Sequence, residues 1–176
     1  MNDRAKAATM PAGSLTPDPA LGADMRAAIE RFLIEYARCL DEDRLEAWPD
    51  FFLDDGCYQV LSRENVEHGL PAPIIYHYSR GMIEDRVTSL RDALTYEPVY
   101  TRHMVSNVYI VGVEAGVYRV TSNYAVYQTT VEGRTDLYSV GRYEDAILVR
   151  DGRLKFKTRT VIADTFAIKN NMALPL

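Results

Sequence analysis

Histidine is scarce in this chain, and its positions bear on any iron chemistry. The three histidines are His68, His77 and His103. A mononuclear iron site takes two histidines and a carboxylate that converge on one face. His68, however, falls in a Gly/Pro-rich stretch, and the other two fall on separate predicted strands. The spacing therefore predicts no metal site, and each histidine is more simply interpreted as a hydrogen-bonded structural or interface residue.

The two cysteines exclude an iron–sulfur cluster of the Rieske type in this chain. A Rieske cluster takes two cysteines and two histidines as ligands in closely spaced Cys/His pairs. Neither Cys39 nor Cys57 has a histidine beside it. Since disulfides are rare in reducing compartments, we interpret both as reduced thiols of a cytoplasmic protein.

Carboxylates offer a second chemistry, general acid–base catalysis. Asp41, Asp54 and Asp55 lie near the ends of predicted elements. In a cone-shaped fold, Asp41, Tyr58 and His103 could converge in the pocket between sheet and helices, where a neighbouring carboxylate tunes a histidine near neutral pH. The same acids are equally typical of turns and helix junctions, so both interpretations stay open.

Nucleophilic and phosphate chemistry are not indicated. Ser106 and Ser139 lack the Gly-x-Ser-x-Gly elbow of serine hydrolases. The chain has no phosphate-binding glycine loop and no Walker motif. Gly112 and Gly141, inside predicted strands, are typical of bends that curl a sheet.

Tyrosine is abundant, with twelve residues, and many fall in the second half of the chain beside arginines. Such rings could line a ligand pocket on one face of a curled sheet. They could equally form a subunit interface, where tyrosine and arginine are enriched. The interleaving of the two types favours the interface. The residues are Tyr118, Tyr124, Tyr127, Tyr138 and Tyr143, with Arg102, Arg119, Arg134, Arg142 and Arg159.

Composition describes an ordinary globular chain. Its 176 residues are 47% hydrophobic and 26% charged, which is enough for one domain with its own core. The net charge of −5 disfavours nucleic-acid and anionic-membrane partners, which select basic surfaces. No run of about 20 apolar residues predicts a membrane helix.

Hydrophobic spacing predicts a flexible tail over 1–23 and one domain over 24–176. Apolar residues recur every three or four positions from Asp24, its predicted N-cap, to Leu40. A shorter helix opens at the acids 41–43 and buries Leu45 and Trp48. A loop covers 62–73, and a third helix covers 80–94.

The second half of the chain predicts a sheet. Strands are expected over 57–61, 74–78, 100–113, 117–131, 134–149 and 153–166, with turns at Gly116, 132–133 and 151–152. In the last strand, Leu154 and Phe156 should face one way, and Lys155, Lys157 and Arg159 the other. Helices followed by one long curling sheet indicate a cone-shaped α+β domain.

Several motifs in chain order resemble the small (beta) subunits of aromatic-ring-hydroxylating dioxygenases, over about residues 25–176. They resemble most the subunits that act with salicylate hydroxylases and terephthalate dioxygenases. The motifs are Glu-Ala-Trp-Pro-Asp-Phe-Phe at 46–52, Tyr-Gln-Val at 58–60, Met-Ile-Glu-Asp-Arg-Val at 82–87, Thr-Arg-His at 101–103, Ser-Asn-Val at 106–108, Gly-Arg-Tyr-Glu-Asp at 141–145, Gly-Arg-Leu-Lys-Phe-Lys-Thr-Arg at 152–159 and Leu-Pro-Leu at 174–176.

The resemblance implies a cystatin-like (nuclear-transport-factor-like) cone, with N-terminal helices packed on a strongly curved antiparallel sheet. It implies assembly with a large alpha subunit, usually as a hexamer of three alpha and three beta subunits (α3β3). In that family the alpha subunit carries the Rieske cluster and the mononuclear iron, and ferredoxin and reductase deliver the electrons. The beta subunit binds no metal and is mainly structural, so no catalytic residue is expected in this chain.

A second interpretation remains, because the same cone houses small dehydratases, isomerases and cyclases. In that case the catalytic residues would be Tyr36, Asp41, Tyr58 and His103. In the beta-subunit interpretation, a different set is expected to contact other subunits. That set is Trp48, Arg102, His103, Tyr124, Arg142 and Arg159.

Overall fold

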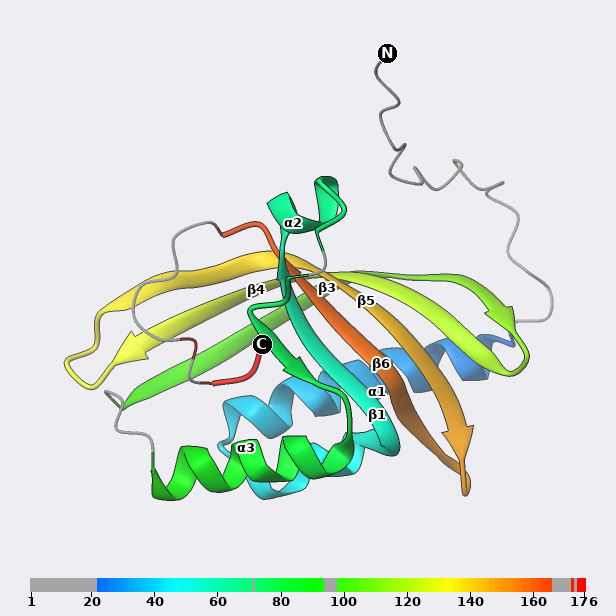
Figure 1. Cartoon of the computed structure of the whole chain (residues 1–176), viewed down its shortest axis with the longest axis horizontal. Coiled ribbons are helices and arrows are strands. Elements are labelled where there is room, and N and C mark those ends of the chain that lie inside the picture. Colours follow the sequence, from blue (N-terminus) through cyan, green and yellow to red (C-terminus); the bar gives the residue numbers. More distant parts are fainter. Residues whose placement is uncertain (1–21, 71, 94–97, 166–171, 173) are drawn as a thin grey trace, which may run out of the picture.

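A long, strongly curved sheet forms one layer of the protein, and the two longest helices lie against one of its faces (Figure 1). The computed structural model describes residues 22–70, 72–93, 98–165, 172 and 174–176. Residues 1–21, which make up most of the predicted tail, lie outside the described residues. The predicted α+β class, with N-terminal helices packed on a curved sheet, is confirmed.

The elements follow one another in the expected order, helices first and the long strands last. They are α1 (Ala23–Asp41), η1 (Leu45–Phe51), β1 (Phe52–Ser62), α2 (Arg63–Glu67), β2 (Ile75–His77), α3 (Arg80–Asp92), β3 (Val99–Glu114), β4 (Val117–Thr130), β5 (Thr135–Arg150) and β6 (Arg153–Ala163).

Helix α1 buries the face that its apolar spacing predicts. Ile29, Leu33, Tyr36 and Leu40 are all buried against the sheet. Its start differs from the prediction, because Gly22 is the N-cap residue and Asp24 lies inside the first turn. There the carboxylate favours the helix dipole without capping a backbone amide.

The connection from α1 to the first strand is shorter than predicted. Helix α1 runs through Asp41, and a 3-10 helix, η1, replaces the second α-helix and buries Leu45 and Trp48. Strand β1 then starts at Phe52 rather than at residue 57. The predicted turn at 54–56 is a β-bulge inside β1, because the pairing with β6 shifts between Phe52 and Cys57.

Two shorter helices flank strand β2. Residues 63–67, predicted as loop, form α2, whose first turn is capped by the Ser62 hydroxyl accepting from the Asn65 amide at 3.2 Å. Helix α3 is capped in the same way by Ser79 and ends at Asp92. Leu94, the predicted end of α3, and Phe166, the predicted end of β6, lie outside the described residues.

The turn signals of the sequence mark the hairpins correctly. Ala115 and Gly116 join β3 to β4, and Asp151 and Gly152 join β5 to β6, each residue with a positive φ. Two consecutive positive φ values are typical of the tight turns that match strand twist. Gly133, between β4 and β5, also has a positive φ.

In the described part of the chain the sheet has the order β2-β1-β6-β5-β4-β3. Its pairs are antiparallel except for β1 and β6, which run parallel. The sheet is therefore mixed rather than wholly antiparallel. The chain between β1 and β6 includes two helices and four strands, and it brings β6 back beside β1 in the same direction. A parallel neighbour needs such a crossover connection.

One expectation about β6 is wrong. Phe156 pairs with Ile147 and Thr158 pairs with Ala146, so Lys157 is an extra residue in the β5–β6 ladder. An extra residue shifts the alternation by one position. Arg159 therefore faces the core with Phe156, instead of facing solvent with Lys157.

None of the helices among the described residues is long and apolar enough to cross a membrane.

A glycine in β5 is required by close backbone approach. A Cβ added at Gly141 would overlap the carbonyl oxygen of Ile162 on β6, whereas one at Gly112 of β3 would meet no atom within 4 Å. We therefore expect Gly141→Ala to lower the free energy of unfolding by about 2 kcal/mol or more.

Urea unfolding of the full chain measures this effect. Gly112→Ala is the matched control and should change stability by about 0.5 kcal/mol or less. Equal stability of the two variants would contradict the packing described for Gly141.

Candidate functional site

A buried ion pair lies at the centre of the core, on the sheet face that the helices cover. Arg159 of β6 and Asp145 of β5 are direct cross-strand partners, and Arg159 Nη1 lies 3.2 Å from Asp145 Oδ2. Neither side chain is exposed to solvent. Burial raises the pKa of Asp145 to about 7, while the Arg159 guanidinium acts to lower it.

Aromatic rings enclose the guanidinium of Arg159 on both sides. Its central carbon lies 3.7 Å from the ring centroid of Tyr143 and 4.1 Å from that of Tyr36. Tyr143 in turn stacks on Tyr124 of β4, with ring centroids 4.5 Å apart. These cation–π and stacking contacts connect α1 to three strands. Burial also raises the pKa of all three tyrosines, so they stay neutral phenols.

The polar groups at the other end of this core are occupied by the chain itself. Tyr36 donates to the Leu176 carbonyl oxygen at 3.2 Å and accepts from the Trp48 indole at 3.1 Å. Tyr58 accepts from the Leu176 amide at 3.0 Å. Leu176 has no exposed surface. Leu176 therefore occupies the hydroxyl groups of both tyrosines.

A second polar pair ties the end of α1 to strand β3. The Asp41 carboxylate accepts from the backbone amide of His103 at 3.0 Å and lies 2.6 Å from its ring Nδ1. Arg102 adds a hydrogen bond to the Asp41 carbonyl oxygen at 3.3 Å. Because β3 is an edge strand, these contacts satisfy edge groups that would otherwise be free to pair with another strand.

The four candidate catalytic residues thus form two separate pairs. Tyr36 and Tyr58 meet at Leu176, whereas Asp41 and His103 meet at the edge of the sheet. No hydrogen bond or ring contact among the described residues joins the two pairs. The expected convergence of Asp41, Tyr58 and His103 on one pocket is therefore not found.

The histidines do not gather around a metal. His68 lies at the exposed end of α2, and His77 stacks on Tyr58 with ring centroids 6.0 Å apart. Within the described residues, no group of three or more His, Cys, Asp or Glu side chains could hold a metal ion. Cys39 and Cys57 are free thiols without a histidine beside them. The residues present therefore do not fit a Rieske cluster or a mononuclear iron.

The structure also places the residues expected at a subunit interface. Trp48, Tyr124 and Arg159 are buried inside the domain, so their side chains cannot reach a partner in this conformation. His103 is buried against Asp41. Arg102 is exposed and Arg142 is half-buried. Of the six residues, only these two arginines have side chains that reach the surface, and the contact with other subunits stays a prediction.

Sequence reasoning missed the two partners that explain the core, Asp145 and Leu176. A signal for Asp145 exists, since it lies two positions from Tyr143 and from Ile147 and so shares their inward face. Leu176 carries no comparable signal, because its contacts with Tyr36 and Tyr58 span more than 100 residues of the chain.

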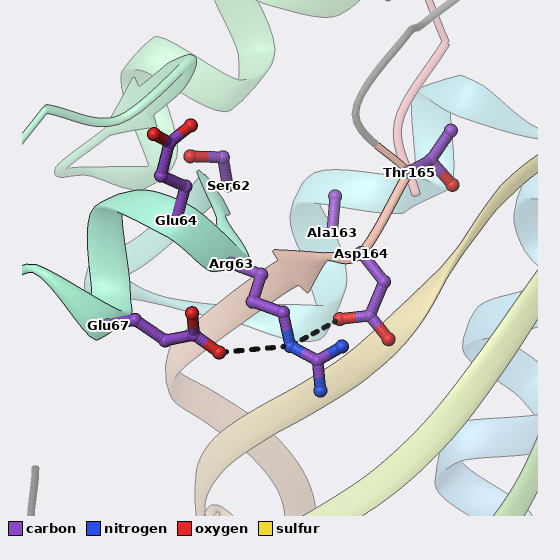
Figure 2. A pocket seen from close by; sticks show the side chains of 7 residues that line it. All are labelled: Ser62, Arg63, Glu64, Glu67, Ala163, Asp164 and Thr165. Atoms are coloured by element: carbon purple, nitrogen blue, oxygen red, sulfur yellow. Dashed lines mark ion pairs between the residues drawn. The ribbon is translucent and has the colours of Figure 1, made fainter.

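A shallow surface pocket of about 160 Å³ lies between α2 and the end of β6 (Figure 2). Its lining comes from residues 62–64, 67 and 163–165. Arg63 points between Glu67 and Asp164, with its Nε 3.4 Å from an oxygen of each. Two acids thus already pair with the one cation of this pocket, and it offers no unpaired charge for an anion.

Comparison with known proteins identifies a family pattern over most of the chain. Residues 35–170 match the family described as ring hydroxylating beta subunit. The chain is 37% identical to the anthranilate 1,2-dioxygenase small subunit of Burkholderia cepacia, over 87% of this chain and 96% of that protein. It is 32% identical to a terephthalate 1,2-dioxygenase terminal oxygenase beta subunit of Comamonas sp, over 84% and 96%.

Solved structures agree with this pattern. A beta subunit from Novosphingobium aromaticivorans, assigned to an aromatic-ring-hydroxylating dioxygenase, matches with a TM-score of 0.80 and 41% identity, over 87% of this chain and 97% of that one. A protein from the same organism assigned as a scytalone dehydratase matches with a TM-score of 0.64 and 22% identity, over 86% and 91%. The second likeness concerns the fold alone, and it confirms the predicted cone.

Removal of the charge on Asp145 should be strongly destabilising. Asp145→Asn leaves the Arg159 guanidinium buried without a counter-charge, so we expect a loss of about 3–5 kcal/mol in the free energy of unfolding. Chemical denaturation measures it. The control is Glu144→Gln, on the exposed side of the same strand, which should cost less than about 1 kcal/mol. A small loss for Asp145→Asn would contradict the role given to the pair.

Truncation of the Leu176 side chain tests whether this residue supports the core. Leu176→Ala removes a fully buried side chain, and we expect a loss of about 2–5 kcal/mol. Leu70→Ala, at a residue 53% exposed, is the control and should be nearly neutral. Thermal unfolding of both variants gives the comparison, and equal melting temperatures would show that Leu176 is not held in the core.

Proposed function

The chain belongs to the family of ring-hydroxylating beta subunits. We propose that it acts as the beta subunit of an aromatic-ring dioxygenase and contributes to the assembly and stability of the complex rather than to its chemistry. The observation that carries this proposal is the occupied interior of the cone. Tyr36 and Tyr58, which would face a substrate in a cone-fold enzyme, hydrogen-bond to the backbone of Leu176 instead. Asp41 and His103 support an edge strand and do not share a pocket with them.

The substrate of the complex is proposed to be an aromatic acid. Two relatives, at 37% and 32% identity, are named for anthranilate and terephthalate, which are both aromatic carboxylic acids. Since this chain offers no open catalytic constellation among its described residues, selection of the acid is assigned to the large subunit.

The cofactors of the reaction are proposed to lie in the alpha subunit. That subunit would carry a Rieske [2Fe-2S] cluster and a mononuclear iron, and electrons from NAD(P)H would arrive through a reductase and a ferredoxin. The ligand chemistry of this chain supports the division, because the described cysteines and histidines do not come together. The proposed assembly is a cytoplasmic hexamer of three alpha and three beta subunits.

Coexpression with the large subunit of an aromatic-ring dioxygenase tests the proposal. We expect a red-brown hexamer that contains iron and oxidises an aromatic acid in the presence of the electron-transfer partners, while the isolated chain stays colourless. Size-exclusion chromatography with light scattering and an iron assay give the two readings.

The contrary outcomes are distinct. A colourless chain that never associates and that dehydrates or isomerises a small cyclic substrate would support a standalone enzyme. Saturable binding of an aromatic acid by the isolated chain, without any association, would support a ligand-binding module.

A further inference from the structure

The sheet face turned away from the helices carries an apolar patch over three neighbouring strands, β3, β4 and β5. Its members alternate with the buried residues of the same strands, so they share the outer face. We call this set the outer patch. It comprises Tyr100 (66% exposed), Met104 (60%), Leu137 (53%), Tyr127 (40%) and Val140 (38%).

Strand register makes the outer patch continuous. Met104 pairs with Ala125, which pairs with Val140, so these three lie side by side across the sheet. The adjacent row pairs Tyr127 with Leu137. Neighbouring strands are about 4.8 Å apart, so the side chains of the two rows form one surface. A contiguous apolar surface of this kind on a soluble domain marks an interaction site.

No helix of the described chain covers this surface. Helices α1 and α3 lie on the opposite side of the sheet, where the core is, and the short helix α2 packs against β1 and β6 instead (Figure 1). The buried face of the same strands is already filled by Val126, Tyr124 and Ser139. The outer patch is therefore a second apolar face that the described residues leave open.

The charge beside the outer patch is positive, although the chain as a whole carries −5. Arg102 pairs directly with Tyr127, in the row that includes Leu137. Among the described residues its guanidinium bonds only to the backbone oxygens of Asp41 and Thr101, and to no carboxylate. An exposed arginine beside an aromatic ring is typical of the residues that dominate binding energy.

We infer that the outer patch is the docking surface for the large oxygenase subunit, which presents an apolar surface with a carboxylate opposite Arg102. This inference rests on the proposed function. Electrostatics favours this occupant over a second copy of the chain. In a two-fold contact the same patch lies on both sides, so each copy would bring Arg102 to the contact and neither patch would bring an acid to pair with it.

The experiment uses the full chain coexpressed with the large subunit. The variant Met104→Asp/Leu137→Asp places two charges at exposed positions, and it should weaken association about 100-fold or more, because buried unpaired charges oppose binding. The control Val149→Asp changes a residue 47% exposed on β5 outside the outer patch and should bind as the native chain does. Isolated chains should melt within a few degrees of one another.

A charge series provides a second, independent variant set. Arg102→Glu should weaken association by about tenfold or more, and binding of the native chain should weaken as salt is raised. Arg153→Glu, at an exposed arginine of the distant β5–β6 hairpin, is the charge-matched control and should have no such effect.

The results separate the two proposals. If the native chain does not bind the large subunit, the proposed function fails. If it binds and both the double variant and Arg102→Glu bind equally well, the inference about the outer patch is overturned. It is also overturned if the isolated chain self-associates through these residues while large-subunit binding is unchanged in the variants.

Discussion

The ion pair between Arg159 and Asp145 is the interaction on which the interior of this cone depends. A buried guanidinium is tolerated only when its charge and its flat faces are both matched. Asp145 supplies the charge from the next strand, and the rings of Tyr36 and Tyr143 cover the two faces. Because Tyr36 belongs to α1, the same arrangement holds the first helix against the sheet and sets the depth of the core.

Occupation of the core has a direct functional consequence. Cone folds that act as enzymes leave a pocket between helices and sheet, with polar side chains aimed into it. Here the comparable hydroxyl groups, those of Tyr36 and Tyr58, are satisfied by the backbone of Leu176, and the nearby indole of Trp48 is satisfied by Tyr36. Although Asp145 Oδ1, the Tyr143 hydroxyl and two nitrogens of Arg159 are buried without a hydrogen-bond partner in the described structure, the two hydroxyls that would face a substrate in such an enzyme are not free to act on one. The geometry thus favours a role exerted from the surface.

The surface is shaped by the same strands that build the core. Successive residues of a strand point to opposite faces, so β3, β4 and β5 each supply one buried and one exposed set. Part of the exposed set, the outer patch, is apolar and lies beside Arg102, which has no carboxylate partner in the described chain. The Asp41–His103 contact blocks part of the adjoining strand edge, which directs a partner to the face of the sheet rather than to its edge.

Local patterns in the sequence determined the apolar face of α1, the hairpin turns at 115–116 and 151–152, the α+β class and the family resemblance. Each of these depends on residues close together in the chain, where spacing and backbone preference act directly. The tertiary structure alone decided that Arg159 faces inward, because one extra residue at Lys157 inverts a two-residue alternation. It also decided that Leu176 closes the cone, since hydrogen bonds spanning 118 and 140 residues leave no trace in local spacing. The sequence could name the candidate catalytic residues only as polar groups, because whether they meet in one pocket depends on packing between distant segments.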